Sequence, residues 1–426
     1  MIPRYEQHDM TEIWTDQFKF KTYLQVEVAI LKALEKNEEV PKDTADKVEK
    51  QAKINVNRIH EIEKTVKHDV IAFCTGITEN LQTDVAKYFH YGVTSSDIID
   101  TSLTVQIKKS LELILPAYEE CLKALYECAK SQKDTLGLGR SHGMYAEPLS
   151  YGQKILGHYN EFSRRYRELQ NFYQNELTMQ ASGAVGNYTL MSPETEEEVA
   201  KELGLKVEPL STQVIPRDRI AKMVQINSLF ACAMERLAVE IRHLHHSDLS
   251  EVHEGFSKGQ KGSSIMPHKK NPISTENLTG MARILRSHSQ IAMDNVVLWH
   301  ERDISHSCAE RLYLPDHFGV MLYSLRRLTG TLKKLVFHEE TIQSKVLKNV
   351  TYLSSYYLHE LIQKTDLRRE KLYEILQRAA FKVSEDMSKE TNKQATDIYF
   401  DELMLTLAEN EITDIELVRP NFEELK

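Results

Sequence analysis

Hydrophobic residues recur at helical spacing over most of the chain, and five stretches of this pattern are unusually long. In residues 96–133, apolar side chains follow one another three or four positions apart, from Ile98 through Leu111 to Leu125. This period places them on one face of an α-helix. Four later stretches show the same pattern: residues 150–180, 217–250, 273–298 and 305–335. The sequence therefore predicts five helices of roughly 40–55 Å each, at about 1.5 Å per residue.

Residues that start or bend helices support these bounds. Three hydroxyl residues, 94–96, precede the first stretch and can cap its N-terminus. Pro148 and Pro216 stand just before the second and third stretches, where a proline suits a helix start. Pro116 lies inside the first stretch, and we expect it to kink that helix without ending it.

The remaining patterns complete a helical fold. Helices of such length with mixed aliphatic faces favour a bundle over a strict coiled coil. Residues 1–93 predict an N-terminal domain of shorter helices, 94–340 the central long-helix bundle, and 341–426 a small C-terminal helical domain. Strand signals are limited to Leu136–Gly139 and Val207–Leu210. We predict an all-α protein of three helical domains, whose long apolar stripes associate with other subunits.

Composition narrows the classes of function. The chain has 426 residues, of which 41% are hydrophobic and 27% charged, as in large folded proteins. Its net charge of −9 disfavours nucleic acid and membrane surfaces as partners, so an anionic ligand needs a local cluster of cations. Five scattered cysteines without a Cys-x-x-Cys motif indicate reduced thiols. With no signal-peptide pattern and no apolar stretch of membrane-spanning length, we expect a cytoplasmic protein.

The densest chemical signal is a loop at residues 255–272. Gly255, Gly259 and Gly262 give its backbone conformational freedom. Residues 262–272 read Gly-Ser-Ser-Ile-Met-Pro-His-Lys-Lys-Asn-Pro, which places two hydroxyls, a histidine, two lysines and an asparagine together. The final proline is well placed to open the next helix. Such a loop can close over an anion, although a polar surface loop is the ordinary alternative.

Four further clusters share this chemical character, and three of them have an ordinary interpretation as well. Residues 67–69 are Lys-His-Asp. Residues 90–97 could hold a carboxylate at the start of the first long helix, or simply cap that helix. Residues 139–148 place a histidine before a glutamate, which suits an acid or base but also a structural histidine. Residues 299–311 carry two arginines that could bind phosphate or carboxylate, or could lie in a solvated turn.

Several other chemistries do not fit the sequence. Residues 255–264 are glycine-rich, but they lack the phosphate-loop pattern and no strand precedes them. Among His243, His245 and His246, only the first and last share a helix face, and no cysteine or carboxylate completes a zinc set at standard spacing. No Gly-x-Ser-x-Gly motif is present. We therefore predict neither a catalytic metal nor a hydrolase triad.

Together these segments resemble the adenylosuccinate lyase branch of the fumarase/aspartase superfamily. Residues 262–272 resemble the superfamily's shared motif, and His268 is similar to this branch where other branches carry glycine or glutamine. The remaining segments that carry the resemblance are Pro3-Arg4-Tyr5, Met10, Ile13, Trp14, Lys19–Glu27 and residues 67–69, 90–97 and 140–143. The resemblance spans essentially the whole chain.

The resemblance implies an assembly and a reaction. The family is an all-α homotetramer with a twenty-helix core, five helices from each subunit, and active sites built from three subunits. The implied reaction is a β-elimination that removes fumarate from adenylosuccinate, giving AMP. The same site would cleave succinylaminoimidazole carboxamide ribotide to the carboxamide ribotide in purine synthesis. No cofactor is implied, because both proton transfers are within reach of side chains.

The resemblance also assigns roles in catalysis. Ser263 would be the base, activated when the loop closes and excludes water, and His142 would be the acid. Lys269, with Asn271, would stabilise the doubly charged carboxylate intermediate. Glu276 would pair with His142 and tune its basicity.

Substrate contacts are implied for a larger set of residues. His68, with Lys67, would orient the phosphate or the succinyl carboxylates, and His68 belongs to the catalytic group as well. Thr94 and Ser95 would bind a succinyl carboxylate. The full set is Arg4, Tyr5, Lys67, His68, Asp69, His90, Thr94, Ser95, Gln213, Ser264, Met266, Lys269, Asn271, Arg302, Ser307 and Arg311.

Two rival interpretations remain open from the sequence. The first is another lyase of the superfamily, such as one that acts on argininosuccinate. The second is a structural bundle that has kept the fold without catalysis. The intact Ser263, His142, Lys269 and Asn271 argue against this second interpretation.

Overall fold

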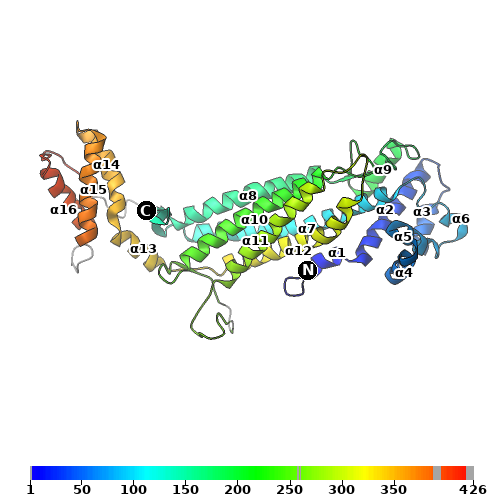
Figure 1. Ribbon diagram of the computed structural model, residues 1–426, viewed down its shortest axis with the longest axis horizontal. Helices are drawn as coiled ribbons and strands as arrows, with labels where there is room; N and C mark the ends of the chain where they lie inside the picture. Colours follow the sequence, from blue (N-terminus) through cyan, green and yellow to red (C-terminus); the bar gives the residue numbers. More distant parts are fainter. Residues whose placement is uncertain (1, 257–258, 260, 387–394, 419–426) are drawn as a thin grey trace. The chain divides into compact units, whose positions relative to one another are not determined.

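The computed structural model describes residues 2–256, 259, 261–386 and 395–418, and helices dominate them (Figure 1). These residues fall into two compact units. The first comprises Met1–Leu122, Glu161–Val239 and Ile273–Gly330, and the second Lys123–Asn160, Glu240–Pro272 and Thr331–Lys426. The predicted division at residues 93 and 340 stays a prediction. No described helix is long and apolar enough to cross a membrane.

Short helices make up the N-terminal part of the first unit. They are α1 (His8–Ile13), α2 (Asp16–Lys36), α3 (Thr44–Gln51), α4 (Val56–Val66), α5 (Asp69–Thr78) and α6 (Thr83–Ala86). Thr15 caps α2 by accepting the N–H of Phe18. Phe20 of α2 stacks on Phe73 of α5 with ring centroids 5.8 Å apart, at the centre of a buried apolar cluster.

A further helix, α9 (Pro193–Leu203), lies against α2 and was not predicted. Its ends carry standard signals, since Ser192 caps it, Pro193 opens it and Gly204 ends it with φ +60°. The strands β3 (Thr178–Met179) and β4 (Lys206–Val207) flank it and pair in parallel. The predicted strand at Val207–Leu210 is therefore wrong beyond its first residue.

The five predicted long helices are all present. They are α7 (Ser95–Ser131), α8 (Tyr151–Asn175), α10 (Asp218–Leu244), α11 (Ile273–Asp294) and α12 (Ser305–Leu332). Pro116 lies within α7 and does not end it. The Tyr118 hydroxyl of α7 donates to the Phe162 carbonyl of α8 at 3.0 Å, and its ring contacts Phe230 of α10. Within the first unit, α7, α8 and α10 therefore pack together.

Buried polar contacts join α10 to the last two long helices. Ser228 donates to the Leu285 carbonyl of α11 at 3.3 Å. Asn227 Nδ2 lies 3.0 Å from His317 Nε2 of α12, and the other ring nitrogen of His317 lies 3.3 Å from His288 Nδ1 of α11. Fixed pairs of this kind set the register of a bundle whose apolar faces alone would tolerate sliding.

A β-hairpin and a C-terminal helical group shape the second unit. The antiparallel strands β1 (Leu136–Ser141) and β2 (Met144–Ser150) form the hairpin, with an irregularity between Leu138 and Arg140. The prediction of a strand at Leu136–Gly139 is thus confirmed, and the strand extends further. The other elements are β5 (Val252–His253), β6 (Val336–Phe337), α13 (Glu339–Lys348), the 3-10 turn η1 (Val350–Tyr352), α14 (Leu353–Lys364), α15 (Arg369–Asp386) and α16 (Ala395–Ala408). Tyr357 and Tyr399 stack in the C-terminal core.

Candidate active site

In the first unit, the start of α5 lies beside the start of α7 and beside Arg311, the last residue of the sequence motif at 299–311. His68 Nδ1 accepts the N–H of Ile71 at 3.4 Å and so caps α5. Its Nε2 lies 3.4 Å from the Ser95 hydroxyl. Asp69 forms an ion pair with Arg311 of α12. Four predicted site residues from three separate segments are therefore neighbours: His68, Asp69, Ser95 and Arg311. Lys67, which directly precedes His68, has φ +54°.

The turn before α7 is fixed by a buried carboxylate. Asp97 accepts the N–H of Thr94 at 2.8 Å and the N–H of Gly183 at 3.3 Å. Burial raises the pKa of Asp97 to about 7, and the two backbone donors only partly offset this. The ordinary reading of residues 94–97 as a helix cap is confirmed. This cap holds Thr94 and Ser95 in place at the N-terminus of α7, where an anion is favoured.

His90 is held by a glutamate from α2. Its Nδ1 lies 2.7 Å from Glu27 Oε1, and its backbone N–H donates to Glu27 Oε2 at 3.2 Å. The residue adopts φ +63°, so these bonds stabilise an uncommon backbone conformation. Burial opposes the charged ring, but the hydrogen bond and the charge of Glu27 outweigh it and raise the pKa of His90.

A cavity of about 310 Å³ lies in the first unit beside these residues. Three predicted site residues line it: Arg302, Ser307 and Arg311. Arg302 Nη1 donates to the Gln213 side chain at 3.0 Å, so the structure brings a fourth predicted residue to the same place. Two arginines and a hydroxyl around one small cavity suit a phosphate or a carboxylate.

Buried ionic groups that the sequence analysis missed also line this cavity. Arg217 donates two hydrogen bonds to Asp100, at 2.6 and 2.8 Å, and its Nε lies 3.0 Å from Glu310. The side chains of all three are nearly inaccessible to solvent. Burial and the charge of Asp100 raise the pKa of Glu310 to about 7, against the opposing effect of Arg217. With Glu310 protonated, the three groups carry no net charge.

The raised pKa of Glu310 predicts stability that declines as the pH rises. A glutamate in the unfolded chain has a pKa near ~4.3, so the stabilising contribution is complete below this value. It is lost as the pH rises through the folded-state pKa of about 7. The Glu310→Gln substitution should flatten the fall in the free energy of unfolding between pH 5 and pH 7, by on the order of 1–3 kcal/mol. Urea unfolding at several pH values measures this, with the exposed Glu301→Gln as control, and an unchanged slope in E310Q would contradict it.

Tyr5 packs against α12. Its ring meets the ring of Tyr323 edge-on at 5.3 Å. The Tyr323 hydroxyl donates to Asn277 at 3.0 Å and accepts from Arg327 at 2.7 Å. Arg4 beside it is exposed. Glu276 lies in the first turn of α11, also exposed.

In the second unit, His142 occupies the tip of the β1–β2 hairpin. It and Gly143 have φ values of +53° and +80°, between the paired residues Ser141 and Met144. Two consecutive residues with positive φ are typical of a type I′ turn. The segment around His142 is therefore a tight hairpin, and the histidine side chain is exposed at its end.

A buried carboxylate holds this hairpin near its turn and at its open end. Glu251 forms an ion pair with Arg140 of β1, next to the turn, and a second with Lys345 at 2.8 Å. It also accepts the hydroxyl of Tyr151, which directly follows β2. The stem that carries His142 is consequently rigid, because one buried carboxylate joins both ends of it.

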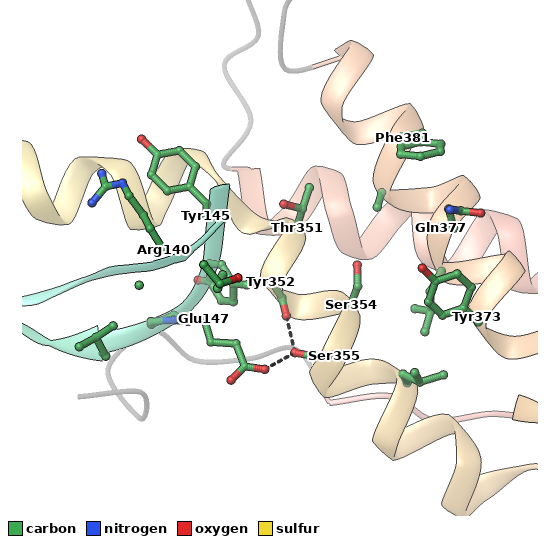
Figure 2. A pocket seen from close by; sticks show the side chains of 18 of the residues that line it. Arg140, Tyr145, Glu147, Thr351, Tyr352, Ser354, Ser355, Tyr373, Gln377 and Phe381 are labelled. Atoms are coloured by element: carbon green, nitrogen blue, oxygen red, sulfur yellow. Dashed lines mark hydrogen bonds between the residues drawn. The ribbon is translucent and has the colours of Figure 1, made fainter. Parts of the chain in front are cut away.

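A larger cavity of about 830 Å³ lies between the hairpin and the C-terminal helices (Figure 2). None of the predicted site residues lines it. Glu147 of β2 accepts a hydrogen bond from Ser355 of α14 at 2.8 Å, and Figure 2 shows this carboxylate directed at α14. Glu147 therefore binds Ser355. This contact gives no support to the idea that Glu147 orients His142.

The catalytic loop predicted at 255–272 is described except for residues 257, 258 and 260, which lie outside the described part of the chain. The Ser263 hydroxyl oxygen accepts the N–H groups of Ile265 and Met266, at 3.3 and 3.0 Å. Asn271 Nδ2 donates to the Gly262 carbonyl at 2.8 Å and closes the loop at its base. Ser264, Met266 and Lys269, the other predicted residues of this loop, are exposed.

The chain is similar to known lyases in sequence and in fold. The family described as "Lyase" matches residues 4–285. Adenylosuccinate lyase from Thermotoga maritima is 40% identical over 383 residues, covering 90% of this chain and 88% of the relative. Adenylosuccinate lyase from Aquifex aeolicus is 42% identical over 397 residues, covering 92% and 90%. The chain belongs to the adenylosuccinate lyase family.

Solved structures place this adenylosuccinate lyase family member in a wider fold group. A fumarate lyase from Mesorhizobium sp. BNC1 has a TM-score of 0.82 at 23% identity, covering 96% of this chain and 94% of that one. The 3-carboxy-cis,cis-muconate lactonizing enzyme from Pseudomonas putida has a TM-score of 0.83 at 22% identity, covering 96% and 92%. At such identities the likeness establishes the fold alone.

The structure adds residues to the predicted site of this family member. Glu27 holds the predicted residue His90. Three further residues line the cavity that contains Arg302, Ser307 and Arg311; they are Asp100, Arg217 and Glu310. The signal for Glu27 was present, because it ends one of the segments that carry the resemblance. The trio comes from positions more than ninety residues apart, so no local pattern could have joined it.

Proposed function

We propose that this protein cleaves adenylosuccinate to AMP and fumarate by non-hydrolytic β-elimination. It would also release fumarate from succinylaminoimidazole carboxamide ribotide. The observation that carries the proposal is the identity of 40–42% to adenylosuccinate lyases over about 90% of the chain. The grouping of predicted anion-binding residues around one cavity supports it.

The base in this mechanism is Ser263. A serine is a weak base at neutral pH, so its alkoxide must be stabilised when it takes the proton next to the succinyl carboxylate. Two backbone N–H groups already point at its oxygen, those of Ile265 and Met266. Hydrogen bonds to the charged form lower the energy of that form, which supports Ser263 in this role.

The acid is His142, which protonates the departing nitrogen. A rigid hairpin tip suits a group that must be presented to a substrate held elsewhere. Glu276 pairs with His142 in the assembled site and favours the protonated imidazole. Lys269 and Asn271 stabilise the intermediate, whose charge spreads into the carboxylate.

Substrate binding is divided between two groups of residues. Arg302, Ser307 and Arg311, with Gln213, take the phosphate and one carboxylate in the cavity of about 310 Å³. His68, Thr94 and Ser95 at the start of α7 take the succinyl carboxylates, where backbone N–H groups favour an anion. The remaining contacts in this proposal come from Arg4, Tyr5, Lys67, Asp69, His90, Ser264 and Met266.

The active site would be completed by other subunits of a homotetramer with a twenty-helix core. Exposed apolar side chains on the long helices support this assembly, among them Leu229, Ile284, Ile291 and Leu312. The three-domain division of the sequence fits the same assembly. Free cysteines fit a cytoplasmic location.

Loop geometry at Gly262 gives a prediction for this function. A Cβ at this position would overlap the Lys269 carbonyl oxygen. The Gly262→Ala substitution should therefore displace Ser263 and reduce turnover by roughly 10²-fold, as small misplacements of reacting groups do. Turnover and the unfolding midpoint are measured together. Gly157→Ala on α8 is the control, since its added Cβ meets no atom within 4 Å. Normal turnover in G262A would show that turnover does not require the close approach of Gly262 to Lys269 at the base of the loop.

A product assay tests the proposed function. The purified protein is incubated with adenylosuccinate and, separately, with argininosuccinate, and the products are separated by chromatography. We expect AMP and fumarate in equal amounts from the first substrate and no cleavage of the second. Cleavage of argininosuccinate, or of neither compound, would overturn the proposal.

A further inference from the structure

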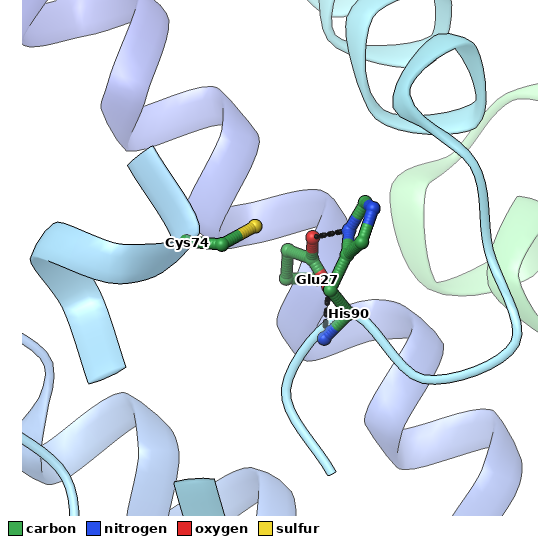
Figure 3. Close-up of side chains that lie close together, drawn as sticks. All are labelled: Glu27, Cys74 and His90. Carbon is green, nitrogen blue, oxygen red and sulfur yellow. Dashed lines mark hydrogen bonds and ion pairs between the residues drawn. The ribbon is translucent and has the colours of Figure 1, made fainter. Parts of the chain in front are cut away.

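Three potential metal ligands from separate segments meet behind the turn that leads into α7 (Figure 3). Among the described residues, Glu27 of α2, Cys74 of α5 and His90 offer ligand atoms that all lie within 4.8 Å of one another. Figure 3 shows the Cys74 sulfur directed toward the carboxylate and the imidazole. These ligands are not the histidines at 243–246, whose spacing in the sequence suggested a metal.

The donor set and its separations fit a thiophilic divalent ion. Zinc takes thiolate, imidazole and carboxylate ligands at about 2.0–2.3 Å in a tetrahedron, which separates ligand atoms by about 3.3–3.8 Å. The His90 Nδ1 and Glu27 Oε1 atoms, which lie 2.7 Å apart, would separate on metal binding. The Cys74 sulfur would move closer to both of them. Rotations of the side chains supply changes of this size. Three protein ligands leave a fourth position for water or a small anion.

The surroundings of the three ligands also suit such an ion. The Glu27 side chain is 1% exposed, and its second oxygen accepts the backbone N–H of His90. An outer hydrogen bond of this kind orients a ligating carboxylate. The buried rings of Phe73 and Phe89 lie next to Cys74 and His90 in the chain and belong to the same apolar core, which limits competition from water.

We propose that Glu27, Cys74 and His90 form a binding site for one Zn²⁺ or a similar thiophilic divalent cation. Binding displaces the proton of the Cys74 thiol, which leaves as H⁺. A proton shared by Glu27 and His90 moves to the distal ring nitrogen or to solvent, which frees both ligand atoms. The ion itself takes no part in the elimination, although one of its ligands, His90, is a substrate contact in the proposed function.

Metal binding at this site would engage the imidazole of His90 and draw it away from the substrate contact that the proposed function assigns to it. We therefore expect the bound ion to inhibit turnover, a consequence that rests on the proposed function. The binding itself does not rest on it and is measured without substrate.

Cobalt substitution tests the site on the full-length protein. Metal-free protein is titrated with Co²⁺, and the thiolate-to-cobalt charge-transfer band and the bound metal per chain are recorded. We expect one Co²⁺ per chain with this band in the wild type, displaced by Zn²⁺. Cys74→Ser should lose the band, whereas Cys128→Ser, which removes another half-buried thiol, should keep it. Circular dichroism confirms that both variants are folded.

Defined outcomes overturn the proposal. A wild-type protein without the band at a few equivalents of Co²⁺ lacks the site, and a band that survives in C74S comes from other cysteines. Glu27→Gln provides a second test, since it should weaken Co²⁺ binding at least tenfold while the thiol remains. Turnover of metal-free wild type and C74S is assayed in parallel and should be equal. If that turnover is absent while the band is present, the proposed function fails and the metal site stands.

Discussion

Replacing Ser263 with alanine is expected to reduce turnover by roughly 10²–10⁴-fold, the usual contribution of a positioned proton-transfer group. The substitution removes the oxygen that accepts the proton and leaves the carboxylate and phosphate contacts intact. The Michaelis constant should therefore stay within a few-fold of wild type. Initial rates of fumarate formation over a range of adenylosuccinate concentrations separate the two parameters.

The neighbouring hydroxyl provides the matched control. Ser264→Ala changes the same kind of side chain in the same exposed loop, and its effect on turnover should be much smaller. The Ser263 oxygen differs in accepting two backbone N–H groups, which is the reason for assigning it the alkoxide. Near-normal turnover in S263A, or an equal loss in S264A, would remove Ser263 from the role of base.

Replacing His142 is expected to have an effect of similar size, roughly 10²–10⁴-fold in turnover. Asparagine is the best substitution, because it tolerates the positive φ of this hairpin position and cannot donate a proton as imidazolium does. The departing nitrogen would then leave without an acid. Single-turnover measurements should show a slow chemical step with substrate binding retained.

A control at the other side of the hairpin tip separates chemistry from turn geometry. Met144 is 73% exposed and pairs with Ser141 across the turn. Met144→Ala should keep most of the wild-type turnover. If M144A lost as much activity as H142N, the hairpin would matter through its shape and His142 would not be the acid.

The fold was predictable where a pattern extends over many residues. The helices α7, α8, α10, α11 and α12 follow an apolar period that repeats for twenty residues or more, so their existence could be read directly. The β1–β2 hairpin could not, since its strands are six and seven residues long and its turn is a His-Gly pair, a less familiar signal than Asn-Gly. Helix α9 carries ordinary cap residues, but at 11 residues its apolar pattern is much shorter than those of the long helices and was not recognised.

The candidate site was predictable as a set of residues but not as contacts. Motif resemblance supplied His68, Arg302 and Arg311, whereas their partners depend on tertiary structure. Asp69 meets Arg311 across 242 positions of the chain, and Gln213 meets Arg302 across 89. Pairings over such distances leave no local trace in one sequence.

The proposed assembly builds each active site from several subunits, and we propose that the base Ser263 and the acid His142 of one site come from different ones. Mixing inactive S263A with inactive H142N under conditions of subunit exchange tests it most directly. In mixed tetramers formed at equal amounts, about a quarter of the sites would receive an intact Ser263 from one variant and an intact His142 from the other. Fumarate formation should therefore recover to about a quarter of the wild-type rate. Mixed tetramers verified by mass that remain inactive would contradict the claim.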